Sequence, residues 1–346
     1  MTGPPEQQVA SLQAEYLPDV GAWLRDALAD PAAGINHLLR YHMGWEDAEG
    51  VQGPSDGGKA LRPVLCLTAC ELAGGDWRRA LPAAAALELV HNFSLVHDDI
   101  QDGDVLRRGR ETLWSLWGVP AALSGGNAMR VIADRTLAKL ETSGLPPASV
   151  MRASAELNRR YLEMIEGQYL DMAFEQRPRV TVAEYLDMIG RKTGALFESA
   201  MFLGALVAND DPRQAHAFGA CGRRMGIAFQ VRDDYLGVWG DPAKTLKPLT
   251  DIQRKKRSLP MLYMLEAASR EDRECLAAAY ADDQISSENL ERILLLLDRL
   301  GAEEYVTRTA EACASEAVSL AAALGLPAGR QRTLEAIAAY CVQRDR

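Results

Sequence analysis

The chain has 346 residues, of which 48% are hydrophobic and 25% are charged, so it can bury the core of a globular protein. Its formal net charge is −10 and it has no dense basic block, which argues against nucleic-acid binding. No segment reaches the roughly 18–20 apolar residues that cross a bilayer. The N-terminus also lacks a signal-peptide pattern, so we expect a cytoplasmic protein without a membrane span.

Helix-forming residues dominate the chain, because Ala, Leu, Glu and Arg fill most windows and alternating strand patterns are nearly absent. We expect residues 1–20 to be a flexible segment, 44–58 to be a glycine-rich loop, and Asp76 to cap the helix behind it. No break is long enough for a domain linker, so we predict one all-α domain over 1–346, a bundle of roughly ten or more helices. The expected helices lie near 20–40, 59–73, 78–102, 120–141, 147–174, 181–191, 193–208, 212–238, 256–281, 286–300, 302–324 and 327–344.

The first acidic cluster, Asp98, Asp99 and Asp102, ends an apolar helical run. Asp98 and Asp102 are one helical turn apart, so both side chains can reach a single point. Arg107 and Arg108 follow directly. Carboxylates with arginines beside them are typical of divalent cations that bridge a protein to a phosphorylated ligand.

A second acidic pair, Asp233 and Asp234, lies inside another apolar helical run. Lys247 and a basic stretch at 254–257 follow it. Charged residues are rarely buried without partners. The recurrence of paired carboxylates with cations behind them therefore predicts two clusters that face one cavity and hold metal. The alternative for each cluster is a solvated helix surface.

Several short motifs complete the pattern. They are Gly57-Gly58-Lys59-Ala60-Leu61-Arg62-Pro63, Leu87-Glu88-Leu89-Val90-His91 ahead of Asp98–Asp102, Leu106-Arg107-Arg108-Gly109, Gly167-Gln168 with Asp171, Lys192-Thr193-Gly194, and Phe229-Gln230 with Asp233-Asp234. In this order and spacing, over about residues 35–265, the chain resembles the trans-isoprenyl diphosphate synthases, the family of farnesyl and geranylgeranyl diphosphate synthases. The resemblance implies the isoprenoid synthase fold, with helices around a central cavity. It also implies a prenyltransferase that joins isopentenyl diphosphate to an allylic diphosphate.

The resemblance also implies that the reaction begins when the allylic diphosphate ionises with the help of three Mg²⁺ ions, for which Mn²⁺ can substitute. Their direct ligands would be Asp98, Asp102 and Asp233, and Asp99 and Asp234 would act through water or hydrogen bonds. The residues implied to bind the same diphosphate are Arg107, Lys192 and Lys247. The residues implied to turn oxygen atoms towards the developing positive charge are Thr193 and Gln230.

The second substrate, isopentenyl diphosphate, would be bound by basic residues rather than by metal. By resemblance these residues are Lys59, Arg62, His91 and Arg108. Helical geometry supports part of this, because His91, Ser94, Asp98 and Asp102 fall on one helix face. The two diphosphate sites would therefore be neighbours along one helix.

Product length is expected to depend on Phe93 and Ser94, five and four positions before Asp98. A phenylalanine followed by a small residue, with no insertion in the first motif, resembles short-chain synthases that make the C20 product geranylgeranyl diphosphate. A C15 or a C25 product stays open.

Two departures from the family pattern leave other functions open. Gly237 stands where the second motif usually has a third Asp, and Asn127 stands where the family usually has Asp. A terpene cyclase on the same scaffold is one alternative, and the basic set for isopentenyl diphosphate argues against it. A non-catalytic subunit that modulates a prenyl synthase is the other, and the complete first motif argues against it. The resemblance also implies a homodimer, whereas the pathway that uses the product does not follow from the sequence.

Overall fold

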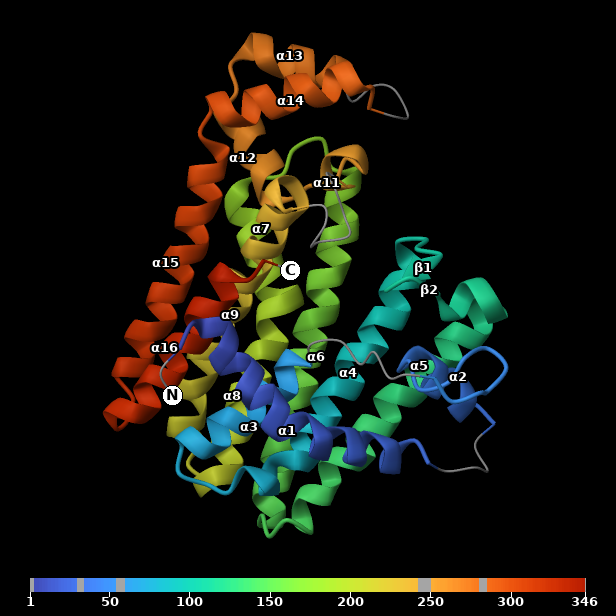
Figure 1. Ribbon diagram of the computed structural model, residues 1–346, viewed down its shortest axis with the longest axis vertical. Helices are drawn as coiled ribbons and strands as arrows, with labels where there is room; N and C mark the ends of the chain where they lie inside the picture. The colour runs from blue at the N-terminus through green and yellow to red at the C-terminus, as the bar shows by residue number, and fades with distance from the viewer. Residues whose placement is uncertain (1–2, 30–33, 54–59, 242–249, 280–284, 346) are drawn as a thin grey trace. The chain divides into compact units, whose positions relative to one another are not determined.

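The computed structural model describes residues 3–29, 34–53, 60–241, 250–279 and 285–345, and the described chain is mostly helical (Figure 1). This confirms the predicted all-α fold. A two-stranded hairpin interrupts the helices, with β1 (Leu106–Arg107) antiparallel to β2 (Arg110–Glu111). The helices are α1 (Pro5–Ala27), α2 (Asn36–His42), α3 (Leu61–Leu72), η1 (Trp77–Ala80), α4 (Leu81–Gln101), α5 (Leu113–Ala138), η2 (Lys139–Glu141), α6 (Pro147–Gln176), α7 (Val182–Ile189), the π-helical turn η3 (Gly190–Gly194), α8 (Ala195–Asn209), α9 (Pro212–Trp239), α11 (Thr250–Gln253), α12 (Leu259–Ala267), α13 (Arg270–Ala279), α14 (Ser287–Arg299), α15 (Ala302–Ala322) and α16 (Ala328–Gln343).

The chain divides into two compact units. Unit 1 comprises Met1–Val9, Leu162–Glu198 and Ala220–Arg346, and unit 2 comprises Ala10–Tyr161 and Ser199–Gly219. The unit boundaries fall inside α1, α6, α8 and α9. A single domain over the whole chain stays a prediction.

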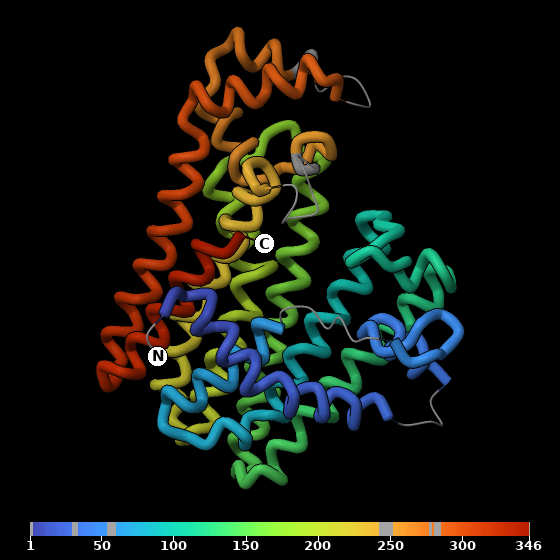
Figure 2. Tube along the Cα trace, in the orientation of Figure 1, coloured from blue at the N-terminus to red at the C-terminus, as the bar shows by residue number. Residues whose placement is uncertain are grey.

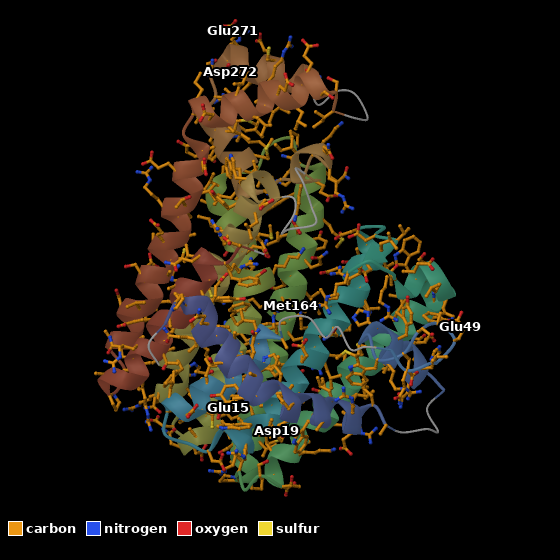
Figure 3. All side chains as sticks on the ribbon, in the orientation of Figure 1. Glu15, Asp19, Glu49, Met164, Glu271 and Asp272 are labelled. Atoms are coloured by element: carbon orange, nitrogen blue, oxygen red, sulfur yellow. The ribbon has the colours of Figure 1, made fainter. Side chains whose placement is uncertain are left out.

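The N-terminal segment differs from the expectation. Instead of a flexible stretch over 1–20, the described chain forms α1 from Pro5 onward. Apolar residues at helical spacing give this helix a buried face, whereas Glu15 and Asp19 lie on its exposed face (Figure 3). The Tyr16 hydroxyl also donates to Glu71 Oε2 at 2.6 Å. The buried apolar side chains are Val9, Leu12, Tyr16, Val20 and Leu24.

Three other helices differ from the prediction, and the first is the one expected near 20–40, since α1 ends at Ala27 and α2 begins only at Asn36. Helix α5 begins at Leu113 instead of 120, because two helical pieces join across Gly118, which has φ +81°. The helix expected over 256–281 is broken into α12 and α13, because Ala268 adopts an extended conformation. Ser269 then caps α13, because its hydroxyl oxygen accepts from the Asp272 N–H at 3.1 Å. Asp76 caps η1 as expected, since its carboxylate accepts from the Arg78 N–H at 3.1 Å.

Close helix packing holds α4 in the core of unit 2. This helix packs against α3 and α5, and its residues Ala83–Ala86 are completely buried. Helix α8 touches α3 at Gly204, where a Cβ atom would lie 1.9 Å from the Cys66 carbonyl oxygen. Only glycine permits this approach, so the position of these helices is tightly constrained.

The core of unit 1 is formed by apolar side chains from α6, α7, α9, α12 and α15. Helices α15 and α16 run beside each other in this unit (Figure 2). Across the described residues, the structure contains no helix whose length and apolarity would suffice to cross a membrane.

Candidate active site

The first acidic cluster lies at the C-terminal end of α4, in unit 2. Asp98 is half-buried, and Asp102 is exposed and follows the last helical residue. The Asp102 N–H still donates to the Asp98 carbonyl oxygen at 2.8 Å, so the helical geometry continues to Asp102. The structure therefore brings Asp98 and Asp102 to the same face, one turn apart.

Asp99 has a different environment, because its side chain is buried. Burial raises the pKa of Asp99 to about 6, although Arg107 opposes the shift. The Arg107 Nε donates to Asp99 Oδ1 at 2.6 Å. Asp99 thus orients Arg107, one of the residues expected to bind the allylic diphosphate.

The hairpin β1–β2 presents the two arginines. Arg108 and Gly109 occupy its turn with φ +52° and +74°, and Arg108 is a non-glycine residue in the left-handed region. Arg110 anchors the hairpin, because its guanidinium donates to the carbonyl oxygens of Tyr41 at 3.0 Å and Glu46 at 2.6 Å. These contacts fix the positions from which Arg107 and Arg108 project.

A basic cluster surrounds His91 in unit 2. Burial lowers the pKa of His91 well below its ordinary value, and the nearby charges of Arg62, Arg108 and Arg107 lower it further. Arg62, His91 and Arg108, which were predicted for the second diphosphate, therefore come together. Lys59, the fourth predicted member of this set, lies outside the described residues, as does Lys247.

His42 is a member of this cluster that the sequence analysis did not find. Burial, reinforced by Arg107 and Arg108, lowers the pKa of His42 to about 3, so its imidazole is neutral at physiological pH. His42, Arg107, Arg108 and Arg110 also line a cavity of about 250 Å³. The His42 imidazole also hydrogen-bonds the side chain of Asn92, which holds the ring in place within this cluster.

The expected chain-length residues lie on α4 as well. Phe93 is 5% exposed, and its ring centroid lies 4.4 Å from that of His97 and 5.4 Å from that of Tyr161. Gly126 on α5 packs closely against the same pair of rings, because a Cβ atom there would lie 2.5 Å from the His97 ring. The Ser94 hydroxyl donates to the His91 carbonyl oxygen at 2.7 Å, so it hydrogen-bonds within its own helix.

The second acidic pair lies on α9, in unit 1, and its two carboxylates are unlike. Asp233 is exposed, whereas Asp234 is 1% exposed. Asp234 Oδ2 accepts from the Tyr185 hydroxyl at 2.5 Å and from the Leu259 N–H at 3.1 Å. Its Oδ1 accepts from the Gln230 amide at 3.3 Å. Asp234 therefore links α9 to α7 and α12 and points away from solvent.

Gln230 continues this hydrogen-bonded chain to Thr193. Because the Gln230 Nε2 donates to Asp234, its Oε1 is left to accept from the Thr193 hydroxyl at 2.9 Å. Tyr185 belongs to none of the sequence motifs, and only its proximity to Asp234 in the fold reveals it. The chain Tyr185–Asp234–Gln230–Thr193 fixes the orientation of both oxygens that were expected to face positive charge.

Lys192 and Thr193 belong to the π-helical turn η3. Such turns are frequent at functional sites, because the extra residue displaces side chains from the regular helical pattern. Gly167 on α6 makes room for the turn, since a Cβ atom there would lie 2.3 Å from the Lys192 backbone nitrogen. The Lys192 Nζ lies 2.6 Å from Asp171 Oδ2. Gly167 and Asp171 of the Gly-Gln motif thus both position Lys192.

The two departures from the expected motifs lie apart from these interactions. Asn127 is exposed on α5, between the exposed side chains of Leu123 and Val131. Gly237 lies one turn after Asp233 on α9 and adds no carboxylate to it.

The carboxylates fit Mg²⁺, although the described residues contain no ready-made group of three or more metal-ligating side chains. Mg²⁺ prefers oxygen ligands and is usually held by one or two carboxylates together with substrate phosphates and water. Asp98 and Asp102 provide such a pair on one helix face. The donor set therefore suits a metal that arrives with a phosphorylated ligand.

Residues 51–297 match the family model described as polyprenyl synthetase. The chain is 37% identical over 329 residues to a geranylgeranyl diphosphate synthase of Mycobacterium tuberculosis, covering 94% of this chain and 91% of that protein. It is also 37% identical over 313 residues to a (2E,6E)-farnesyl diphosphate synthase of Mycobacterium bovis, covering 89% and 86%.

Solved structures agree with this match. A polyprenyl synthetase from Streptomyces coelicolor superposes with a TM-score of 0.90 at 34% identity, covering 96% of this chain and 99% of that one. A polyprenyl synthase from Caulobacter crescentus, solved with calcium and isoprenyl diphosphate, gives a TM-score of 0.83 at 27% identity, covering 100% and 99%.

Together with the all-α fold and the carboxylates beside clustered arginines, these matches define the class of this protein as a trans-prenyltransferase. The chain belongs to the polyprenyl synthetase family. The predicted membership of the trans-isoprenyl diphosphate synthases is thereby confirmed.

Proposed function

We propose that this short-chain prenyltransferase condenses an allylic diphosphate with isopentenyl diphosphate and releases geranylgeranyl diphosphate, the C20 product. The observation that carries the proposal is that α4 serves two tasks in unit 2. Its C-terminal end presents Asp98 and Asp102, and His91 lies two turns earlier in the cluster with Arg62 and Arg108. An enzyme that only ionises one prenyl diphosphate has no use for the second anion site.

Ionisation of the allylic diphosphate is the first proposed step. Asp98, Asp102 and Asp233 hold Mg²⁺, which when bound supplies positive charge to the leaving diphosphate. Arg107 and Lys192 bind the oxygens of the same diphosphate. Asp99 positions Arg107 through an ion pair, and Asp171 positions Lys192 in the same way.

The second proposed step joins the two substrates. Isopentenyl diphosphate is bound by Arg62, His91, Arg108 and Lys59. Lys247 binds the allylic diphosphate. Both Lys59 and Lys247 lie outside the residues that the structure describes. The oxygens of Thr193 and Gln230, held in place by Asp234, stabilise the positive charge that develops on the allylic carbon.

One assay separates this function from its alternatives. Dimethylallyl, geranyl and farnesyl diphosphates are each incubated with and without isopentenyl diphosphate and Mg²⁺. We expect elongated diphosphates only when both additions are present. Hydrocarbon or alcohol formed without isopentenyl diphosphate would identify a terpene cyclase, and no turnover with any substrate would favour a modulating subunit.

The proposed product length rests on the packing of Phe93. Its ring is held between His97 and Tyr161 and can end the space available to the growing chain. Phe93→Ala is expected to shift the product distribution from C20 to longer chains, and Phe93→Leu to shift it less. An unchanged distribution in Phe93→Ala would overturn this part of the proposal.

We also propose that the enzyme is a homodimer, with a second copy covering one face of α6. Soluble monomers rarely expose a long apolar row along one helix. Met151 is 71% exposed, Leu162 57%, Ile165 40% and Tyr169 67%, and all four fall at helical spacing on the same side of α6.

A further inference from the structure

The last described turn of the chain is firmly anchored to α9. Arg344 follows α16 and is 3% exposed. Its backbone N–H donates to the Tyr340 carbonyl oxygen at 3.2 Å, and its own carbonyl oxygen accepts from Arg232 Nε at 3.0 Å. Its guanidinium donates to the Phe229 carbonyl oxygen at 3.1 Å and lies 3.7 Å from the centroid of the Phe229 ring.

The same guanidinium is hydrogen-bonded to Asp233 Oδ1. The Asp233 side chain is otherwise open to solvent, with 45% of its surface exposed. Asp233, which is a Mg²⁺ ligand in the proposed function, therefore already pairs with a positive side chain of the same protein. Because guanidinium cannot lose its proton at physiological pH, this partner is permanently charged.

We propose that Arg344 is the built-in counter-cation of Asp233 and keeps divalent metal from that carboxylate until a diphosphate is bound. This inference rests on the proposed function, because only there is Asp233 a metal ligand. A fixed positive charge beside Asp233 repels Mg²⁺ and also occupies one of its carboxylate oxygens. The negative charge of a diphosphate offsets this repulsion, so metal and diphosphate bind at Asp233 together.

The other contacts of Arg344 determine what happens to this residue when a metal ion replaces it at Asp233. Its backbone and side chain are tied to Phe229 and Arg232, which precede Asp233 on α9. When a metal ion binds Asp233, the ion pair between Asp233 and Arg344 breaks. The other contacts keep Arg344 beside α9, so the ion pair can form again when the metal leaves. Arg344 acts through Asp233 and is a positioning residue.

Metal binding without substrate tests the proposal directly. The free Mn²⁺ signal in electron paramagnetic resonance gives the Mn²⁺ affinity of the full chain. Arg344→Met keeps an unbranched apolar side chain over the Phe229 ring and removes the charge. We expect Arg344→Met to bind Mn²⁺ about tenfold more tightly than the wild type in the absence of diphosphate. Arg344→Lys retains the charge and should stay near the wild type.

Arg224→Met is the matched control, because Arg224 lies on α9, the helix of Asp233, but pairs with Glu316 at 2.9 Å. It removes the same charge and should leave the Mn²⁺ affinity unchanged. Adding Asp233→Asn to Arg344→Met should abolish the gain.

The proposal is overturned if Arg344→Met binds Mn²⁺ no more tightly than Arg224→Met, or if the gain survives Asp233→Asn. Thermal unfolding of each variant shows whether the fold is intact. If Arg344→Met fails to fold, Arg344→Gln replaces it in the same comparison. Failure of the proposed function has a different signature, since no variant would then form elongated diphosphates whatever the Mn²⁺ affinities.

Discussion

The adjacent carboxylates Asp233 and Asp234 have the same chemistry but different surroundings. Asp233 is exposed, and the Arg344 guanidinium is the partner described above for its side chain. Asp234 is buried and accepts hydrogen bonds from Tyr185, Gln230 and the backbone of Leu259. A side chain saturated in this way orients its neighbours and has little capacity left for a metal ion.

Asp234→Asn tests this division of roles. The asparagine amide would face Gln230 with an NH₂ group, so Gln230 would turn over and direct its own NH₂ at Thr193. We expect kcat to fall about 10- to 100-fold, with the Mg²⁺ concentration for half-maximal rate unchanged. Asp233→Asn should instead raise that Mg²⁺ concentration. Equal changes in Mg²⁺ dependence for the two variants would contradict the assignment.

His42 gives a pH-dependent prediction. Its pKa is about 3 in the folded chain, below the ordinary value of 6.5, because of burial and the charges of Arg107 and Arg108. The unfolded chain therefore binds a proton first as the pH falls. The free energy of unfolding should decrease below pH 6.5, by at most about 1.4 kcal/mol per pH unit for this group.

His42→Asn removes this contribution, so its unfolding free energy should fall less steeply than that of the wild type between pH 6.5 and 4.5. Urea unfolding at a series of pH values measures the difference. Parallel curves for the two proteins would mean that His42 is not held neutral by the fold.

The π-helical turn η3 depends on α6, the helix beside it. Gly167 on α6 leaves the space into which the Lys192 backbone fits. Gly167→Ala is therefore expected to destabilise the fold by about 1–3 kcal/mol and to lower activity, because a backbone atom cannot move as easily as a side chain.

Gly21→Ala is a suitable control for this substitution. A Cβ atom at Gly21 would meet only the end of the flexible Arg25 side chain, at 3.3 Å. Since alanine favours a helix interior, Gly21→Ala should be neutral or stabilise by about 0.5–1 kcal/mol. Chemical denaturation of both variants gives the comparison, and a Gly167→Ala protein as stable as Gly21→Ala would refute the packing argument.

The helices themselves were largely predictable, because apolar periodicity and Gly/Pro breakers mark them in the sequence. The errors occurred where local signals mislead. Polar residues concealed the buried face of α1, and the helix breakers Gly118 and Pro120 concealed the start of α5. The π-helical turn could not be predicted, since its extra residue is stabilised by packing against Gly167 and not by a local pattern.

The site was predictable only as far as its motifs reach. Arg62, His91 and Arg108 belong to recognisable motifs, and the fold does place them together. His42, Tyr185 and Arg344 carry no comparable signal, because each gains its meaning from a neighbour far away in the sequence. Arg344 and Asp233, for example, are separated by 111 positions.

The exposed apolar row on α6 predicts the oligomeric state of the protein. Leu162→Arg places a charge in the middle of this row, and burying an unpaired charge at an interface is costly. We expect the wild type to be a dimer by light scattering coupled to size exclusion, and Leu162→Arg to be a monomer. Leu295→Arg, at a 69% exposed leucine on α14, should leave the dimer intact. A wild-type monomer, or equal masses for all three proteins, would exclude this interface.

The π-helical turn also limits how the chain can vary in length. From Val182 to Asn209 the chain is helical without interruption, and η3 contains one residue more than a regular α-helical turn. Deleting a single residue between Gly190 and Gly194 would restore a regular helix and leave α7 and α8 in phase, because the π-helical turn absorbs one extra residue. Lys192 would then lose the displaced position that the turn gives it, whereas an added residue would rotate α8 by about 100° relative to α7 and turn its apolar face away from the core. This segment can therefore accept exchanges of side chains, whereas a one-residue change in its length would disrupt either the diphosphate site or the core.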